Sequence, residues 1–87
     1  MKRGATNRKL TVKARAPFHV YYEGAASIIS AENSVGKFDI LPGHADFFSV
    51  MTPGEVSIET ETGPVNFRIS GGIITVRSDE AMLFVNF

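Results

Sequence analysis

The chain has 87 residues, 44% of them hydrophobic and 21% charged, with a formal net charge of zero. This length fits one small domain with a single core, and the composition is too apolar for a disordered segment. The sequence holds no cysteine, which excludes disulfides and thiolate metal sites, and its apolar runs are far shorter than the roughly 20 residues of a membrane-spanning helix.

The basic side chains concentrate near the N-terminus. The residues that precede the first acid include Lys2, Arg3, Arg8, Lys9, Lys13 and Arg15, and the remainder of the chain is acidic. We predict a flexible basic arm at residues 1–8 and a folded domain at residues 9–87. Two roles stay open for the arm, a solvated terminus or a segment attracted to phosphate-rich surfaces. Nucleic acid is not an expected partner, because the aromatic residues are not interleaved with Lys or Arg.

Turn residues recur about every 8 to 12 positions, which is typical of the short strands of a sandwich or barrel. Between the turns, apolar and polar residues alternate with a period of two, which predicts strands with one buried face. The predicted strands are residues 9–15, 18–23, 25–32, 37–41, 46–51, 55–61, 65–70, 72–77 and 80–86. The expected fold is all-β, a two-sheet sandwich or flattened barrel of about nine to ten short strands.

The string GKFDILPGHADFF sets a turn between two apolar runs. We predict that Pro42 and Gly43 form the turn and that His44 hydrogen-bonds its backbone, while Ile40 and Leu41 anchor it to the core. No motif pairs His44 with a nucleophile, a base or metal ligands, so we expect no enzyme activity, no catalytic residue, no metal and no cofactor.

A glycine pair opens the predicted strand at residues 72–77. Gly71 and Gly72 follow Ser70 without either of the Gly-rich phosphate-binding patterns, and no helix follows them. We interpret the pair as a tight strand junction or a close approach of two backbones.

The last predicted strand is apolar on both faces. Met82 and Phe84 lie on one face, and Leu83 and Val85 lie on the other. Two interpretations stay open: an interior strand that is covered on both faces within the domain, or a strand whose outer face contacts another subunit.

Taken in order, these motifs resemble the N-terminal β-sandwich of epsilon subunits of F-type ATP synthases. That family carries a Gly-Glu-Phe-Gly-Ile-Leu-Pro-Gly-His-Ala stretch, a later Pro-Gly and a Ser-Gly-Gly before the next-to-last strand. The matching residues here are Gly36, Phe38, Ile40, Leu41, Pro42, Gly43, His44, Ala45, Pro53, Gly54, Ser70, Gly71 and Gly72. The resemblance runs from about residue 9 to Phe87, the point at which family members usually continue into a two-helix C-terminal domain.

The resemblance implies a non-catalytic subunit of the central stalk of a proton-translocating ATP synthase. Such a subunit couples the gamma subunit to the polar loops of the c-ring during rotation, and it lies peripheral to the membrane at the cytoplasmic face of the cell inner membrane. The two-helix domain binds ATP in some members and inhibits rotation in others, so this sequence gives no basis for predicting either activity. The alternative is a free-standing β-sandwich protein-binding module that is no longer part of an ATP synthase.

The resemblance also places the candidate contacts. Those with the c-ring are Glu32, Lys37 and Asp39, and those with gamma are His44, Met82 and Phe84. The family has Glu and Gly where this chain has Lys37 and Asp39, and a c-ring loop typically presents an Arg. We expect Glu32 or Asp39 to supply the lost negative charge, or the c-ring loop to be altered to match. We also expect weak self-association of the isolated domain through an apolar face.

Overall fold

The computed structural model describes residues 8–86, which form nine β-strands and no helix. The strands are β1 (Leu10–Ala16), β2 (His19–Ala26), β3 (Ile28–Asn33), β4 (Gly36–Ile40), β5 (Phe47–Met51), β6 (Gly54–Thr60), β7 (Gly63–Ile69), β8 (Gly71–Arg77) and β9 (Glu80–Asn86). Each predicted strand is present, with small shifts at the ends. The predicted all-β class is therefore confirmed.

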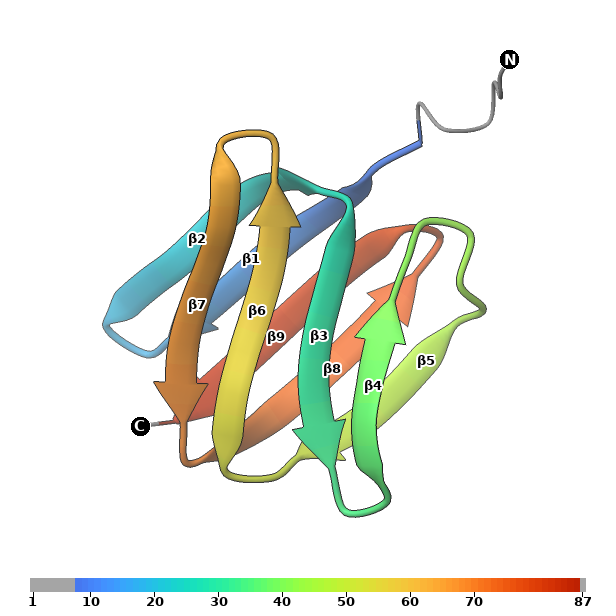
Figure 1. Cartoon of the computed structure of the whole chain (residues 1–87). Helices are drawn as coiled ribbons and strands as arrows, with labels where there is room; N and C mark the ends of the chain where they lie inside the picture. Colours follow the sequence, from blue (N-terminus) through green and yellow to red (C-terminus); the bar gives the residue numbers. More distant parts are fainter. Residues whose placement is uncertain (1–7, 87) are drawn as a thin grey trace.

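The strands form two sheets that lie face to face (Figure 1). The five-stranded sheet has the order β2-β1-β9-β8-β5, and the four-stranded sheet has the order β4-β3-β6-β7. The pair β1 and β9 is parallel, and the other paired neighbours are antiparallel. Strands β1 and β9, the first and last strands of residues 8–86, therefore lie side by side within one sheet.

The period-two alternation determines which side of each strand enters the core. In β1, Leu10, Val12 and Ala14 are fully buried and the residues between them are exposed. The four-stranded sheet contributes Ile29 and Ile58, which are also fully buried. Burial of a large aliphatic side chain of this kind contributes about 1.5–3 kcal/mol, so the apolar interior between the sheets holds the fold together.

Strand β9 lies inside the five-stranded sheet with only one of its faces in the core. Leu83 and Val85 are buried on the inner face, whereas Met82 and Phe84 point outward and Phe84 is 54% exposed. The interpretation of β9 as a strand covered on both faces within the domain is therefore wrong. Its outer face is open because no other layer of residues 8–86 covers that side of the sheet.

Gly72 sits where two backbones come close together. It faces Val85 across the β8–β9 pair, and a Cβ added at Gly72 would lie 2.9 Å from the Cα of Val85. Side chains do not tolerate such a distance to backbone atoms, so glycine is required at this position for steric reasons.

The anchoring predicted for the loop after β4 holds for only one of its two residues. Ile40 is buried and pairs with Ile29 in the last step of the β3–β4 ladder. Leu41 is 48% exposed, because the strand pairing ends at Ile40 and the chain turns away from the core. The prediction that Leu41 anchors the loop is wrong.

Candidate interaction surfaces

The outer face of the four-stranded sheet is polar, and we call it the polar face. It carries all three residues predicted to contact the c-ring. In the β3–β4 pair, Glu32 lies opposite Lys37 and Ser30 lies opposite Asp39. The Ser30 hydroxyl donates a hydrogen bond to Asp39 Oδ1 at 2.7 Å. The structure therefore brings Glu32, Lys37 and Asp39 together on one surface.

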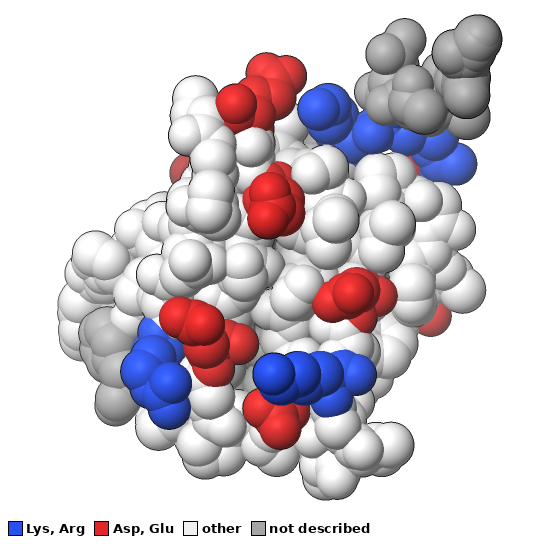
Figure 2. All heavy atoms as spheres, viewed as in Figure 1, with Lys and Arg blue, Asp and Glu red and all other residues white. Residues whose placement is uncertain are grey.

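The polar face continues over β6 and β7. Glu55 lies opposite Arg68 in the β6–β7 pair, as Glu32 lies opposite Lys37 in the β3–β4 pair. All four side chains line one hollow of about 590 Å³, so two acids and two bases share this part of the surface. Figure 2 views this face and shows charged side chains spread among uncharged ones.

The β3–β4 turn at one end of the polar face is held by Asn33. The Asn33 Oδ1 accepts hydrogen bonds from the backbone N–H groups of Val35 at 2.9 Å and Gly36 at 3.2 Å, and its Nδ2 donates to the Ser49 hydroxyl at 3.1 Å. Val35 lies at the tip and is 94% exposed. The turn therefore presents an apolar side chain from a backbone that is fixed by hydrogen bonds.

The outer face of the five-stranded sheet is apolar over β5, β8 and β9, and we call it the apolar face. Its exposed side chains are Phe48, Val50, Ile73, Met82 and Phe84. Ile73 pairs with both Val50 and Phe84, so the apolar side chains run without a break across three strands. Contiguous apolar surface of this kind is typical of a protein contact.

Polar side chains border the apolar face on β1. Lys13 forms an ion pair with Glu23, with Nζ and Oε2 3.6 Å apart. Arg15 donates to the backbone carbonyls of Ala16 at 3.3 Å and Pro17 at 3.4 Å. An apolar centre with a polar rim is the usual layout of a protein interface.

His44 lies in the loop between β4 and β5, residues 41–46, which we call the His44 loop. Gly43 has φ +87°, a left-handed conformation that glycine adopts without steric cost. The His44 backbone N–H donates to the Leu41 carbonyl at 3.1 Å, and the His44 Nδ1 lies 2.7 Å from the Ala45 carbonyl oxygen. The loop is therefore folded on its own hydrogen bonds, and the His44 ring is exposed.

Two hydrogen bonds join the His44 loop to the β8–β9 turn. The Gly43 N–H donates to Asp79 Oδ1 at 2.8 Å, and the Ser78 N–H donates to Asp46 Oδ1 at 3.3 Å. Arg8 binds the other Asp79 oxygen, with Nη2 at 2.5 Å and Nε at 3.1 Å. The hydrogen bond from the Gly43 N–H, followed by that from Arg8, lowers the pKa of the Asp79 carboxyl below its ordinary value.

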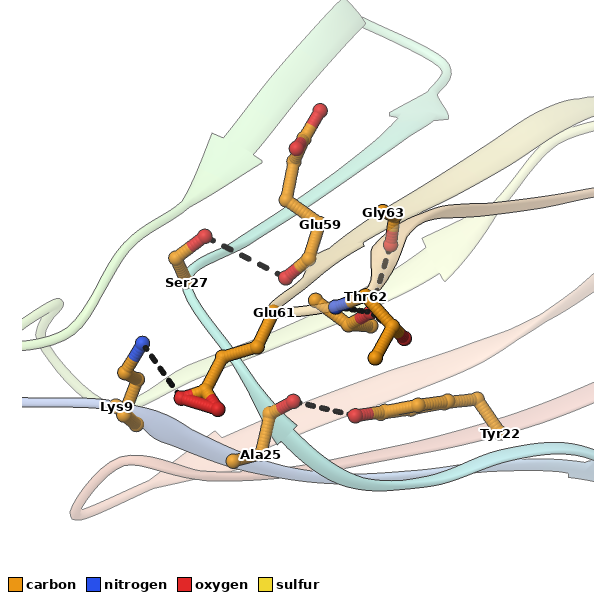
Figure 3. A network of polar contacts seen from close by, with 9 residues as sticks. Lys9, Tyr22, Ala25, Ser27, Glu59, Glu61, Thr62 and Gly63 are labelled. Carbon is orange, nitrogen blue, oxygen red and sulfur yellow. Dashed lines mark hydrogen bonds and ion pairs between the residues drawn. The ribbon is translucent and has the colours of Figure 1, made fainter.

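The predicted basic arm falls mostly outside the residues that the structure describes, which begin at Arg8. Arg8 itself is held by Asp79. Lys9 forms an ion pair with Glu61 in the turn between β6 and β7, with Nζ and Oε2 3.8 Å apart (Figure 3). The described basic residues that lead into β1 are therefore paired with acids from distant parts of the chain.

The same end of the sandwich holds further contacts between the sheets and turns. The Ser27 backbone N–H and hydroxyl both donate to the Glu59 carbonyl, at 2.9 and 3.4 Å. The Tyr22 hydroxyl donates to the Ala25 carbonyl, and the Thr60 hydroxyl donates to the Gly63 carbonyl at 2.6 Å (Figure 3). The Ser27 bonds join the β2–β3 connection to the end of β6, and the other two bonds lie within β2 and within the β6–β7 turn.

Among residues 8–86, no three His, Asp or Glu side chains are grouped so that they could hold a metal ion. Each of the two histidines contacts an aromatic ring edge-on, His19 with Tyr21 at 4.5 Å and His44 with Phe47 at 5.5 Å between centroids. The described part of the chain also lacks a helix with the length and apolar character needed to cross a membrane.

The structure defines a small β-sandwich domain with two contrasting outer faces. Residues 9–86 match the family described as the ATP synthase, Delta/Epsilon chain, beta-sandwich domain. The chain belongs to this family, and the resemblance read from the sequence motifs is confirmed.

The chain is also similar to individual proteins named ATP synthase epsilon chain. The chain is 41% identical over 63 residues to the ATP synthase epsilon chain of Ruthia magnifica subsp. Calyptogena magnifica, covering 72% of this chain but 46% of that protein. It is 36% identical over 63 residues to the ATP synthase epsilon chain of Micrococcus luteus, covering 71% of this chain and 69% of the relative. The match thus spans about half the length of the first relative and about two thirds of the second.

Two solved structures have a similar fold. A chain of the Euglena gracilis mitochondrial ATP synthase, in a structure of OSCP, F1 and c-ring, superposes with a TM-score of 0.81 at 19% identity, covering 88% of this chain and 50% of that one. A chain of the Tetrahymena thermophila mitochondrial ATP synthase central stalk and c-ring gives 0.76 at 22% identity, covering 92% and 65%. At these identities the likeness concerns the fold.

The sequence reasoning found only part of the apolar face. Met82 and Phe84 were predicted contacts, whereas Phe48, Val50 and Ile73 were missed. The signal was present, because the predicted strand at residues 46–51 is apolar on both faces, as the last strand is. Asp79 and Arg8 were also missed, since residues 71 positions apart in the sequence give no local motif.

Proposed function

We propose that this chain is a non-catalytic epsilon-type subunit of the central stalk of a proton-translocating F-type ATP synthase. The observation that carries the proposal is the match of residues 9–86 to the family. In this role the domain joins the gamma subunit to the c-ring and turns with them, peripheral to the membrane at the cytoplasmic face of the cell inner membrane. It needs no cofactor and performs no chemistry of its own.

The two outer faces suit two different contacts. The apolar face, which includes Met82 and Phe84, fits a lasting contact with gamma, because burying exposed apolar side chains favours association. The polar face fits the polar loops of the c-ring, because contacts between solvated charges are weak and screened by salt. A stable contact with gamma and a weaker, salt-sensitive contact with the c-ring suit a subunit that couples the two.

The position of Lys37 supports charge compensation on the polar face. Glu32 lies directly opposite Lys37, and Asp39 lies two residues further along the same strand. An arginine on the facing loop therefore meets Glu32 or Asp39 close to the position where the family has its Glu. We propose that these two carboxylates replace the missing one in the c-ring contact.

A pull-down of the gamma subunit and c-ring of the same organism tests the proposal. Capture of both by the tagged wild-type chain, and loss of gamma when Phe84→Ser is introduced into the apolar face, is the expected result. The matched control is Val35→Ser, which removes an exposed apolar side chain from the β3–β4 turn and leaves the apolar face intact. Capture of neither partner by a folded wild-type chain supports the free-standing binding module instead.

A further inference from the structure

We propose that Asp79 is a positioning residue, which together with Arg8 fixes the His44 loop in the shape that binds gamma. The inference rests on the proposed function, in which the chain binds gamma, and on His44 as a gamma contact that the family resemblance implies. It concerns residues that lie outside both outer faces, at the end of the sandwich where the His44 loop meets the β8–β9 turn.

The two connections hold each other by reciprocal hydrogen bonds. Each one donates a backbone N–H to an aspartate of the other: Gly43 to Asp79 at 2.8 Å and Ser78 to Asp46 at 3.3 Å. Hydrogen bonds to a carboxylate are stronger than those between neutral groups. The His44 loop is therefore tied on both sides of His44 to a turn of the five-stranded sheet.

Arg8 completes the arrangement by fixing the Asp79 carboxylate. Its guanidinium donates twice to Asp79 Oδ2, and it also packs against the loop, since a Cβ at Gly43 would lie 3.3 Å from Arg8 Nη1. The Thr11 N–H donates to the Asp79 carbonyl at 2.8 Å. The segment that leads into β1, the His44 loop and the β8–β9 turn thus converge on one residue.

The backbone conformation of the β8–β9 turn indicates that the Asp79 side chain has a role beyond forming the turn. Ser78 has φ +50° and Asp79 has φ +65°, so both adopt the left-handed conformation that costs energy for residues other than glycine. Hairpin turns of this kind favour Asn-Gly or Asp-Gly. Glycine at position 79 would form the turn more easily but could hold neither Gly43 nor Arg8.

Three variants separate the side chain from the turn. Asp79→Gly keeps the left-handed turn and removes both contacts, and Asp79→Asn keeps an oxygen for the Gly43 N–H but loses the charge that binds Arg8. Ser78→Gly is the matched control, because it eases the same turn and keeps the backbone donor to Asp46. Two quantities are measured on each variant: the exchange rate of the Gly43 amide in the isolated domain by NMR, and the affinity for gamma by titration.

We expect Asp79→Gly to exchange the Gly43 amide about tenfold faster and to bind gamma about tenfold more weakly. Asp79→Asn should fall between it and the wild type, and Ser78→Gly should match the wild type in both measurements. If Asp79→Gly exchanges the Gly43 amide at the wild-type rate, Asp79 does not fix the His44 loop and the inference is wrong. If the variants are folded and exchange changes while affinity does not, the positioning role is wrong and the proposed function stands. If the wild-type domain fails to bind gamma, the positioning role and the proposed function are both overturned. No other outcome overturns both.

Discussion

The two outer faces of the sandwich follow the same alternation but carry opposite chemistry. On the four-stranded sheet the outward positions hold charged residues such as Glu32, Lys37 and Glu55, whereas on the five-stranded sheet they include Phe48, Ile73 and Phe84. The core needs only the inward positions, so the outward ones are free to follow other requirements. The polar face is therefore typical of a surface exposed to solvent, and the apolar face is typical of a surface that another protein buries.

The largest expected effect separates the inner from the outer side of a single strand. Leu83→Ala should lower the free energy of unfolding by about 2–5 kcal/mol, because it opens a cavity in the core. Met82→Ala, one residue earlier on the outer side, should change it by no more than about 0.5 kcal/mol. Urea unfolding of the two variants measures the contrast. Equal losses would mean that the outer face of β9 is packed as part of the domain.

The next effect concerns the apolar face as a contact. The double variant Phe48→Ser and Phe84→Ser should weaken gamma binding by at least about 2 kcal/mol and reduce self-association of the isolated domain, with little change in unfolding. Titration with gamma and sedimentation at high concentration check both parts. Val35→Ser serves as the control, because Val35 is more exposed than either phenylalanine yet lies on the β3–β4 turn. A strictly monomeric wild type would contradict the second part.

A smaller effect tests the hydrogen bonds that join the His44 loop to the β8–β9 turn, and it depends on pH. Folding lowers the Asp79 pKa through the Gly43 N–H and Arg8, so the ionised carboxyl stabilises the fold above its ordinary value of 3.8, and this stabilisation is lost as the pH falls through the folded-state pKa. Asp79→Asn should therefore lower the melting temperature at neutral pH, and the difference should shrink in acid. Ser78→Gly, which changes the same turn and keeps the Asp79 carboxyl, is the control and should keep the wild-type pH dependence. A difference in melting temperature between the wild type and Asp79→Asn that stays the same at every pH would contradict a stabilising role for the ionised Asp79 carboxyl.

The smallest effect belongs to the polar face. Lys37→Glu should strengthen c-ring binding by less than about 1 kcal/mol, and the gain should fade with added salt, because exposed charges are screened. Glu59→Lys reverses a charge on the same face, on β6 rather than on the β3–β4 hairpin, and should leave the affinity unchanged. Binding measured at low and high salt decides the point. If Lys37→Glu changes neither the c-ring affinity nor its salt dependence, the β3–β4 hairpin does not take part in the contact.

The fold was predictable from the sequence because its main determinant is local. Alternation such as Leu10, Val12 and Ala14 against polar neighbours marks a strand and its buried face without reference to the rest of the chain. The outward hydrophobic residues were harder, since Phe48 and Val50 look the same in a sequence whether they enter a core or face a partner. Their exposure depends on which strands become neighbours.

The contacts at Asp79 could not be predicted at all. Arg8, Gly43 and Asp79 come from three separate regions, and only the folded sheets bring them within hydrogen-bond distance. Leu41 shows the opposite failure, because an apolar residue beside a buried one was expected to be buried as well. Where the strand pairing ends decides that outcome, and the composition of the loop does not reveal it.

The parallel pairing of β1 with β9 has a consequence for how the molecule is made. Strands β3, β4, β6 and β7 can pair with one another while the chain is still being synthesised, but the five-stranded sheet stays in two parts until β9 emerges. Pairing β1 with β9 joins segments that are far apart in the sequence, which slows folding. The apolar face over β5, β8 and β9 therefore becomes continuous only after β9 has paired with β8.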